Sequence, residues 1–205
     1  SSEETPVTIE VQSSPDAPQV IDEPSYEVTE DYRLVVDVLD DCDDPNAGLL
    51  CSVFDPDVGD ELTVSLIDKV APEHAAEFSV NPDGSFVYEP EENFNGFDSF
   101  QYRVIDGGFL RSEYITVTLS VLQDNDSPVS APDSYTVSED DELFVGRGSG
   151  LLANDSDIDL DTMTVASFTA PVVVAGSSAE AGTLNVDDDG SFDYTPADNF
   201  NGSIQ

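Results

Sequence analysis

Residues 83–96 read Asp83-Gly-Ser-Phe-Val-Tyr-Glu-Pro-Glu-Glu-Asn-Phe-Asn-Gly96, and residues 189–202 repeat them as Asp189-Gly-Ser-Phe-Asp-Tyr-Thr-Pro-Ala-Asp-Asn-Phe-Asn-Gly202. Ten of the fourteen positions are identical at an offset of 106 residues. A second pair, Ser25-Tyr-Glu-Val-Thr-Glu-Asp31 and Ser134-Tyr-Thr-Val-Ser-Glu-Asp140, supports the same duplication. Because a period of about one hundred residues is the length of a whole domain, the sequence predicts a tandem array of self-contained domains. Such arrays usually provide reach, spacing or several weak contacts, whereas an enzyme needs one converging site.

The charge of the chain limits its partners. Asp and Glu number 45 against five Lys and Arg, so the formal net charge is −40 over 205 residues. A surface this acidic repels nucleic acids and anionic membrane surfaces. No apolar run approaches the ~20 residues that span a bilayer, so no transmembrane segment is expected in this fragment. The 39% of apolar residues is enough for about two domain cores.

The repeat correspondences set the expected domain boundaries. Residues 16–126 are expected to form one complete repeat, and residues 127–205 a second repeat that ends before its last strands. Val7-Thr-Ile-Glu-Val11 aligns with Val117-Thr-Leu-Ser-Val121, the alternating segment at the end of the complete repeat. Residues 1–14 are therefore expected to be the last strand of a preceding repeat.

Strand signals dominate the chain, and no segment has a convincing helical period. Period-two alternation predicts strands at 62–66, 86–88, 100–104 and 116–121. Asn81-Pro-Asp-Gly84 and Asp187-Asp-Asp-Gly190 supply the positive φ of tight hairpin turns. This pattern predicts an all-β fold, in which tandem antiparallel sandwiches of the immunoglobulin type follow one another. The alternating aromatic residues are expected in the core rather than on a sugar-stacking platform: Phe86, Tyr88, Phe100 and Tyr102.

Cys42 and Cys51 are the only cysteines in the chain. They bracket an acidic insertion that the second copy lacks. Two cysteines this close in a chain with no other thiol predict a local disulfide formed in an oxidising compartment. Two free thiols are the alternative.

Short runs of alternating aspartates recur in both copies, each after Gly-Leu-Leu and before a strand. They are Asp55 and Asp57 in the first copy and Asp155, Asp157 and Asp159 in the second. Calcium takes six to eight oxygen ligands from carboxylates and carbonyls, so such runs in a loop at one end of a sandwich predict calcium ligands. Asx turns and adaptation to high salt remain open as alternatives, because Asp and Asn are common in turns and an acidic surface suits a salty medium without any ion site.

Strand counting places further carboxylates at the two ends of the first sandwich. If the first strand runs down, Glu30 and Asp31 close its lower end, and the loop that contains Glu91 returns there. Asp106 is then expected at the upper end, with the aspartate-rich loop of the same copy.

The connector between the copies is also acidic. It contains Asp124, Asn125 and Asp126, and Glu139 stands in the second copy where Glu30 stands in the first. The lower end of the first repeat, the connector and the upper loop of the second repeat are expected to converge. The sequence therefore predicts a calcium site at this junction.

These acidic segments resemble those of cadherins. Asp124-Asn-Asp-Ser-Pro128 resembles the acidic linker ahead of a proline, Asp155-Ser-Asp157 resembles the Asp-x-Asp loop, and Glu30 resembles the glutamate of the first strand. The stretch at 83–96 is more similar to the cadherin-like tandem repeats of large bacterial surface adhesins and other secreted proteins. The resemblance covers nearly the whole chain. It implies extracellular, calcium-stabilised cadherin-like sandwiches at the cell surface.

Two features depart from this resemblance. Ser52-Val53 stand where the second copy has Asn154-Asp155, which implies a weaker upper site in the first copy. The insertion between the cysteines is not typical of the bacterial repeats.

We therefore expect a non-enzymatic, extracellular, calcium-binding segment that acts as a stalk or adhesive module of a large surface or secreted protein. Its expected partners are calcium, neighbouring repeats of the same chain, and another cell-surface protein or a glycan. The alternative is an accessory module, with carbohydrate binding as one role, of a secreted polysaccharide-degrading enzyme whose catalytic site lies outside this fragment. His74 is the only histidine, so no histidine-based triad can occur in both copies.

Overall fold

The computed structural model describes residues 8–10, 14–38, 42–44, 46–66, 70–169, 171 and 181–205. The chain divides into two compact units, Ser1–Asp124 (unit 1) and Asn125–Gln205 (unit 2). Among the described residues, no helix is both long and apolar enough to cross a membrane. Residues 8–10 are exposed and have no strand structure. The rest of the strand expected within residues 1–14 falls largely outside the described residues, so that expectation stays a prediction.

Unit 1 is built from short strands and one turn of 3-10 helix. The strands are β1 (Gln19–Val20), β2 (Ser25–Thr29), β3 (Leu34–Val36), β4 (Val53–Phe54), β5 (Thr63–Leu66), β6 (Ala75–Val80), β7 (Phe86–Pro90), β8 (Gly96–Ile105) and β9 (Ile115–Leu122), and the 3-10 helix is η1 (Leu49–Ser52). β5, β7, β8 and β9 lie where the alternation predicts them.

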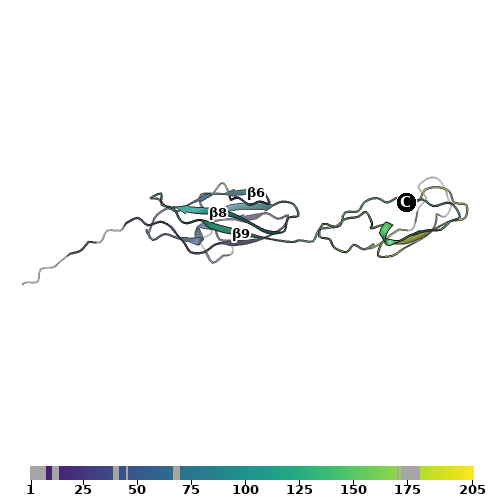
Figure 1. The fold of residues 1–205 in the computed structure, drawn as a ribbon, viewed down its shortest axis with the longest axis horizontal. Coiled ribbons are helices and arrows are strands. Elements are labelled where there is room, and N and C mark those ends of the chain that lie inside the picture. Colours follow the sequence, from purple (N-terminus) through teal and green to yellow (C-terminus); the bar gives the residue numbers. More distant parts are fainter. Residues whose placement is uncertain are drawn as a thin grey trace, which may run out of the picture. The chain divides into compact units, whose positions relative to one another are not determined.

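Two main sheets form the sandwich of unit 1. One has the order β2-β9-β8-β5 and the other the order β3-β7-β6, while β1 pairs only with β4. Figure 1 labels β8 and β9 of the first sheet and β6 of the second. All pairs in the two main sheets are antiparallel except β2 with β9, which is parallel. The predicted all-β sandwich is therefore confirmed, with one parallel pair at the edge of the larger sheet.

The core lies between the two sheets of unit 1, and the alternating aromatic residues fill it. Phe86, Tyr88, Phe100 and Tyr102 are at most 1% exposed, so they are core residues as expected. The Phe86 ring meets the Tyr26 ring edge-on, with centroids 4.9 Å apart. Tyrosine hydroxyls in such a core need acceptors, and Tyr102 donates to the Leu49 carbonyl at 2.8 Å. Burial raises the pKa of Tyr26 to about 12.

Unit 2 repeats part of this architecture. Its elements are β10 (Leu143–Val145), η2 (Arg147–Ser149), β11 (Gly182–Val186) and β12 (Phe192–Pro196). The strands form one antiparallel sheet in the order β10-β12-β11. Its small core contains Val145, Phe192 and Tyr194, and the Tyr194 hydroxyl donates to the Ala181 carbonyl.

The hairpin turns confirm the duplication at the level of individual hydrogen bonds. In unit 1 the Asn81 amide donates to the Ser85 carbonyl at 2.8 Å, and in unit 2 the Asp187 amide donates to the Ser191 carbonyl at 2.9 Å. Gly84 has φ 89° in this turn. Its counterpart Gly190 has φ 81°. This is the left-handed region that glycine enters at little cost.

Cys42 and Cys51 form the predicted disulfide, across a sequence separation of nine residues. Residues 39–41 and 45 of the surrounding acidic insertion lie outside the described residues. The bond ties this insertion to η1, which contains Cys51.

Replacing both cysteines by serine is expected to lower the free energy of unfolding of unit 1 by roughly 2–3 kcal/mol in the chain-entropy description of a loop this short. Urea unfolding of the oxidised parent and the double variant measures this difference. Intact mass after alkylation without reductant checks the bond itself, and two alkylated thiols in protein from an oxidising compartment would contradict it.

Candidate metal centre

The loop between β4 and β5 gathers three carboxylates at one end of unit 1. Asp55, Asp57 and Asp60 each offer an oxygen, and these oxygens all lie within 4.8 Å of one another. The Asp57 amide donates to Asp55 Oδ1 at 2.8 Å, which is an Asx turn. Asp57 Oδ2 in turn accepts the Asp16 amide at 2.7 Å. The local hydrogen bonds thus fix the first two carboxylates before any ion is considered.

Asp106 joins this end of the sandwich from the position directly after β8. Its residue is only 5% exposed, and Asp106 Oδ1 accepts the Leu110 amide at 2.8 Å, which closes the loop that follows. Asp106 Oδ2 and Asp55 Oδ2 are buried atoms that have no hydrogen-bond partner in the described part of the chain. A buried anionic oxygen without a donor is costly unless a cation compensates it.

The electrostatics of the cluster point the same way. Loss of solvent around Asp60 and the neighbouring charges of Asp106, Asp55 and Asp57 raise the pKa of the Asp60 carboxyl above its usual range. Crowded carboxylates favour a proton or a cation, because either relieves their mutual repulsion. The four side chains offer only oxygen, which suits calcium or magnesium rather than zinc. Asp60 was not among the ligands expected from the sequence.

Unit 2 repeats the loop with a different residue correspondence from the one expected. The Asp159 amide donates to Asp157 Oδ1 at 3.0 Å, and Asp159 Oδ2 accepts the Asp126 amide at 2.6 Å. These two bonds match those of the first loop, so Asp157 and Asp159 are the counterparts of Asp55 and Asp57. Asp155 Oδ1 instead accepts the Ala131 amide at 2.8 Å.

This correspondence corrects one expectation about the relative strength of the sites. The contrast between Ser52-Val53 and Asn154-Asp155 implied a weaker site in the first copy. The matched hydrogen bonds show that the first copy has both aspartates of the loop. The difference at Ser52-Val53 therefore removes neither of these two carboxylates from the first copy.

At the other end of unit 1, Glu30 is buried at the end of β2 and is 1% exposed. Glu30 Oε1 accepts the Asp124 amide at 2.7 Å, and Glu30 Oε2 accepts the Asn95 side-chain amide at 3.2 Å. The first-strand glutamate and the start of the connector are therefore joined, as strand counting predicted. Asp31 has φ 62° and accepts the Asn93 amide at 2.9 Å.

Two further candidate residues are placed differently from expectation. Glu91 forms its ion pair with His74, whose Nδ1 lies 3.5 Å from Glu91 Oε2. Glu139 is exposed, whereas its counterpart Glu30 is buried. Asn125 donates from its side chain to the Asp126 carbonyl at 3.0 Å. The convergence of both repeats at the junction joins residues of the two units and stays a prediction.

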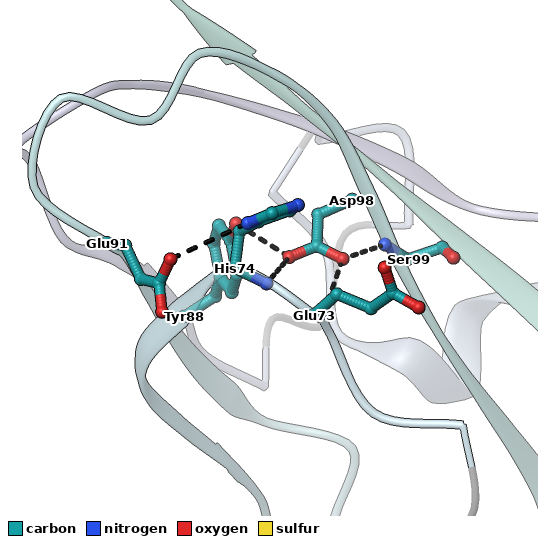
Figure 2. Close-up of polar contacts among 6 residues, drawn as sticks. All are labelled: Glu73, His74, Tyr88, Glu91, Asp98 and Ser99. Carbon is teal, nitrogen blue, oxygen red and sulfur yellow. Dashed lines mark hydrogen bonds and ion pairs between the residues drawn. The ribbon is translucent and has the colours of Figure 1, made fainter.

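Asp98 is a buried carboxylate that was not expected from the sequence, and Figure 2 shows it among its partners. Asp98 Oδ1 accepts the amides of Glu73 and Ser99 at 2.9 and 2.8 Å. Asp98 Oδ2 accepts the His74 amide at 2.9 Å and the Tyr88 hydroxyl at 3.2 Å. With each oxygen satisfied twice, Asp98 clamps the segment before β6 onto β8 and is a structural residue rather than a metal ligand.

The signal that identifies these residues is the phase of the strand. Asp98 and Asp106 have the same parity as the buried Phe100, Tyr102 and Val104 of β8, so all five belong to the inward face. Glu30 continues the inward phase of β2 in the same way. A carboxylate in the inward phase at the end of a strand is therefore a better marker of a built site here than an aspartate in a loop.

Comparisons with known proteins support a family assignment. A model of the bacterial cadherin-like domain matches residues 15–122 and 125–205. No curated protein matches the chain.

Two solved structures illustrate the similarity of fold. Drosophila N-cadherin repeats 1–4 share 11% identity over 92% of this chain and 42% of their own, with a TM-score of 0.35. An endo-fucoidan hydrolase from glycoside hydrolase family 107 shares 17% identity over 91% of this chain and 26% of its own, with a TM-score of 0.36. The chain therefore spans less than half the length of either structure.

Proposed function

The chain belongs to the bacterial cadherin-like domain family, and on that premise we propose that it is a non-enzymatic, extracellular, calcium-stabilised segment of a larger surface or secreted protein. Its role in this proposal is to extend or present other modules as a stalk or adhesive array. The duplicated domain supports it, since a stalk needs repeated self-contained units. The partners are calcium and the neighbouring repeats.

The observation that carries the proposal is the pair of buried oxygens at the end of unit 1. Asp55 Oδ2 and Asp106 Oδ2 have no hydrogen-bond donor among the described residues, and the carboxylates of Asp57 and Asp60 lie beside them. Asx turns account for the Asp55 Oδ1 contact but leave these two atoms uncompensated. High-salt adaptation accounts for exposed acids, whereas Asp106 is buried. A calcium ion would satisfy all four groups, because it accepts six to eight oxygen ligands in flexible geometry.

The matched loop supports a second calcium ion in unit 2. Asp157 and Asp159 are held by the same two hydrogen bonds as Asp55 and Asp57. The position that corresponds to Asp60 in this register is Thr162, a residue without a charge. We therefore propose that the loop of unit 2 binds calcium more weakly than the loop of unit 1.

Calcium is expected to stabilise the chain more than magnesium does at the same ionic strength. Extracellular sites often bind at about 10⁻⁴–10⁻³ M, so ~10 mM calcium contributes about 1.4–2.7 kcal/mol per site. Magnesium gains less, because it requires a tighter octahedral shell and gives up its waters reluctantly. Thermal unfolding in chelator, in calcium and in magnesium measures this, and equal shifts by both cations would count against specific sites.

A further inference from the structure

The outer face of the β2-β9-β8-β5 sheet differs in chemistry from the rest of this acidic chain. Its residues alternate with the buried ones, and many are Ser, Thr or Gln. They are Ser25, Glu27, Thr29, Thr63, Ser65, Phe97, Ser99, Gln101, Arg103, Ile105, Thr116, Thr118, Ser120 and Leu122. Glu27 is the one carboxylate in this set, although the chain has 45 Asp and Glu among 205 residues.

Positive charge gathers at one end of this face. Arg111 forms a bridge with Ile105, so it lies on the same side of the sheet as Ile105 and Arg103. Two of the five Lys and Arg residues of the chain therefore share this face. The outer face of the second main sheet differs, since Glu77 and Glu89 stand opposite each other there.

The two arginines on this face are not neutralised by a carboxylate in the described part of the chain. Arg33, on the opposite sheet, pairs with Glu77 at 2.8 Å, whereas Arg103 and Arg111 take part in no such ion pair. Arg103 lies over the ring of Tyr114 instead, 4.9 Å from its centroid, and Tyr114 is 55% exposed. Two guanidinium groups without a carboxylate partner are unusual in a chain where acids outnumber bases so strongly.

The net charge of the chain does not prevent an anion from binding at this face. At physiological ionic strength the Debye length is about 8 Å, so exposed charges beyond that distance are largely screened. The charges close to the site then decide, and these include the two arginines and the exposed Glu113, which lies between Arg111 and Tyr114 in sequence. Guanidinium groups pair well with carboxylates and sulfates because their donors match two oxygens at once.

We propose that Arg103, Arg111 and Tyr114 form a binding site for an anionic polysaccharide, one that bears carboxylate or sulfate groups. The arginines hold the acidic groups, and the open part of the Tyr114 ring packs against a sugar ring. The neighbouring amide and hydroxyls, of which Gln101 and Thr116 bond each other at 3.1 Å, face the sugar hydroxyls. This site lies on the outer face of one sheet and is separate from the metal centre, so it goes beyond the calcium role.

Affinity electrophoresis of the full chain, in calcium and about 150 mM salt, tests this proposal. Gels contain alginate, dextran sulfate or neutral dextran at matched concentrations. The parent is expected to be retarded by alginate or by dextran sulfate and not by neutral dextran, and the two anionic gels distinguish a uronate ligand from a sulfate ligand. Arg103→Gln and Arg111→Gln are each expected to weaken the retarding affinity roughly tenfold, since each removes charge-assisted hydrogen bonds.

Arg33→Gln is the matched control, because it removes the same charge from the opposite sheet. It is expected to leave the retardation unchanged, and circular dichroism of all three variants confirms that they fold. Failure of both anionic gels to retard the parent overturns the proposal, as does an equal loss in Arg33→Gln. A concentration-dependent dimer in sedimentation that only the Arg103 and Arg111 variants lose would also overturn it, because the face would then belong to a second copy of this chain.

Discussion

Asp98→Ala is expected to lower the free energy of unfolding of unit 1 by about 3–5 kcal/mol, because it removes a buried carboxylate and leaves its donors unpaired. The substitution deprives the amides of Glu73, His74 and Ser99 and the Tyr88 hydroxyl of their acceptor. Water can reach the site only in part, since Asp98 is 7% exposed. Urea unfolding followed by circular dichroism measures the loss.

Two variants control this result. Asp98→Asn keeps one acceptor oxygen in the same shape and is expected to lose less stability than Asp98→Ala. Asp83→Ala removes an exposed carboxylate that bonds only Ser85 in a hairpin turn, so it is expected to cost no more than about 1 kcal/mol. Equal losses in Asp98→Ala and Asp83→Ala would show that the clamp has no special role.

The second large effect is expected at the metal centre. Asp57→Asn combined with Asp106→Asn should raise the calcium dissociation constant of unit 1 on the order of 100-fold or more, because two anionic ligands are lost. Both asparagines keep an oxygen that can accept the amides of Asp16 and Leu110. The loop should therefore stay folded while the ion is lost.

The sign of the stability change distinguishes loss of an ion from simple damage to the loop. In calcium the double variant is expected to melt below the parent, because it loses the bound ion. In chelator it is expected to melt at or above the parent, because the repulsion among Asp55, Asp60 and the two substituted positions is reduced. Asp83→Asn with Glu92→Gln removes two exposed charges elsewhere and should change neither comparison. A double variant that melts below the parent in both conditions, by the same amount, would contradict the site.

The fold was largely predictable from local pattern, because alternation and turn chemistry act over a few residues. The aromatic alternation of Phe100 and Tyr102 and the Asp-Gly turn at Gly84 have the structure that their sequence implies. The disulfide was predictable because only two cysteines exist. The parallel pairing of β2 with β9 was not, since it joins segments about ninety residues apart, such as Ser25 and Thr118, that share no local signal.

The site was predictable in kind but not in membership. Loop composition identified Asp55 and Asp57, yet it could not separate Asp155, which caps the Ala131 amide, from Asp157, which matches Asp55. Glu91 is adjacent in sequence to the expected end but pairs with His74, because side-chain direction decides the contact. Composition counts acids, whereas a site depends on which oxygens the backbone has already satisfied.

Anomalous diffraction from crystals grown in millimolar calcium tests the proposed metal centre most directly, because it locates the ion. We expect a calcium peak about 2.3–2.6 Å from Asp55 Oδ2 and Asp106 Oδ2, with Asp57 or Asp60 completing the shell. A crystal at the same calcium concentration with no peak there, and with both oxygens bonded to protein or water, would contradict the calcium site.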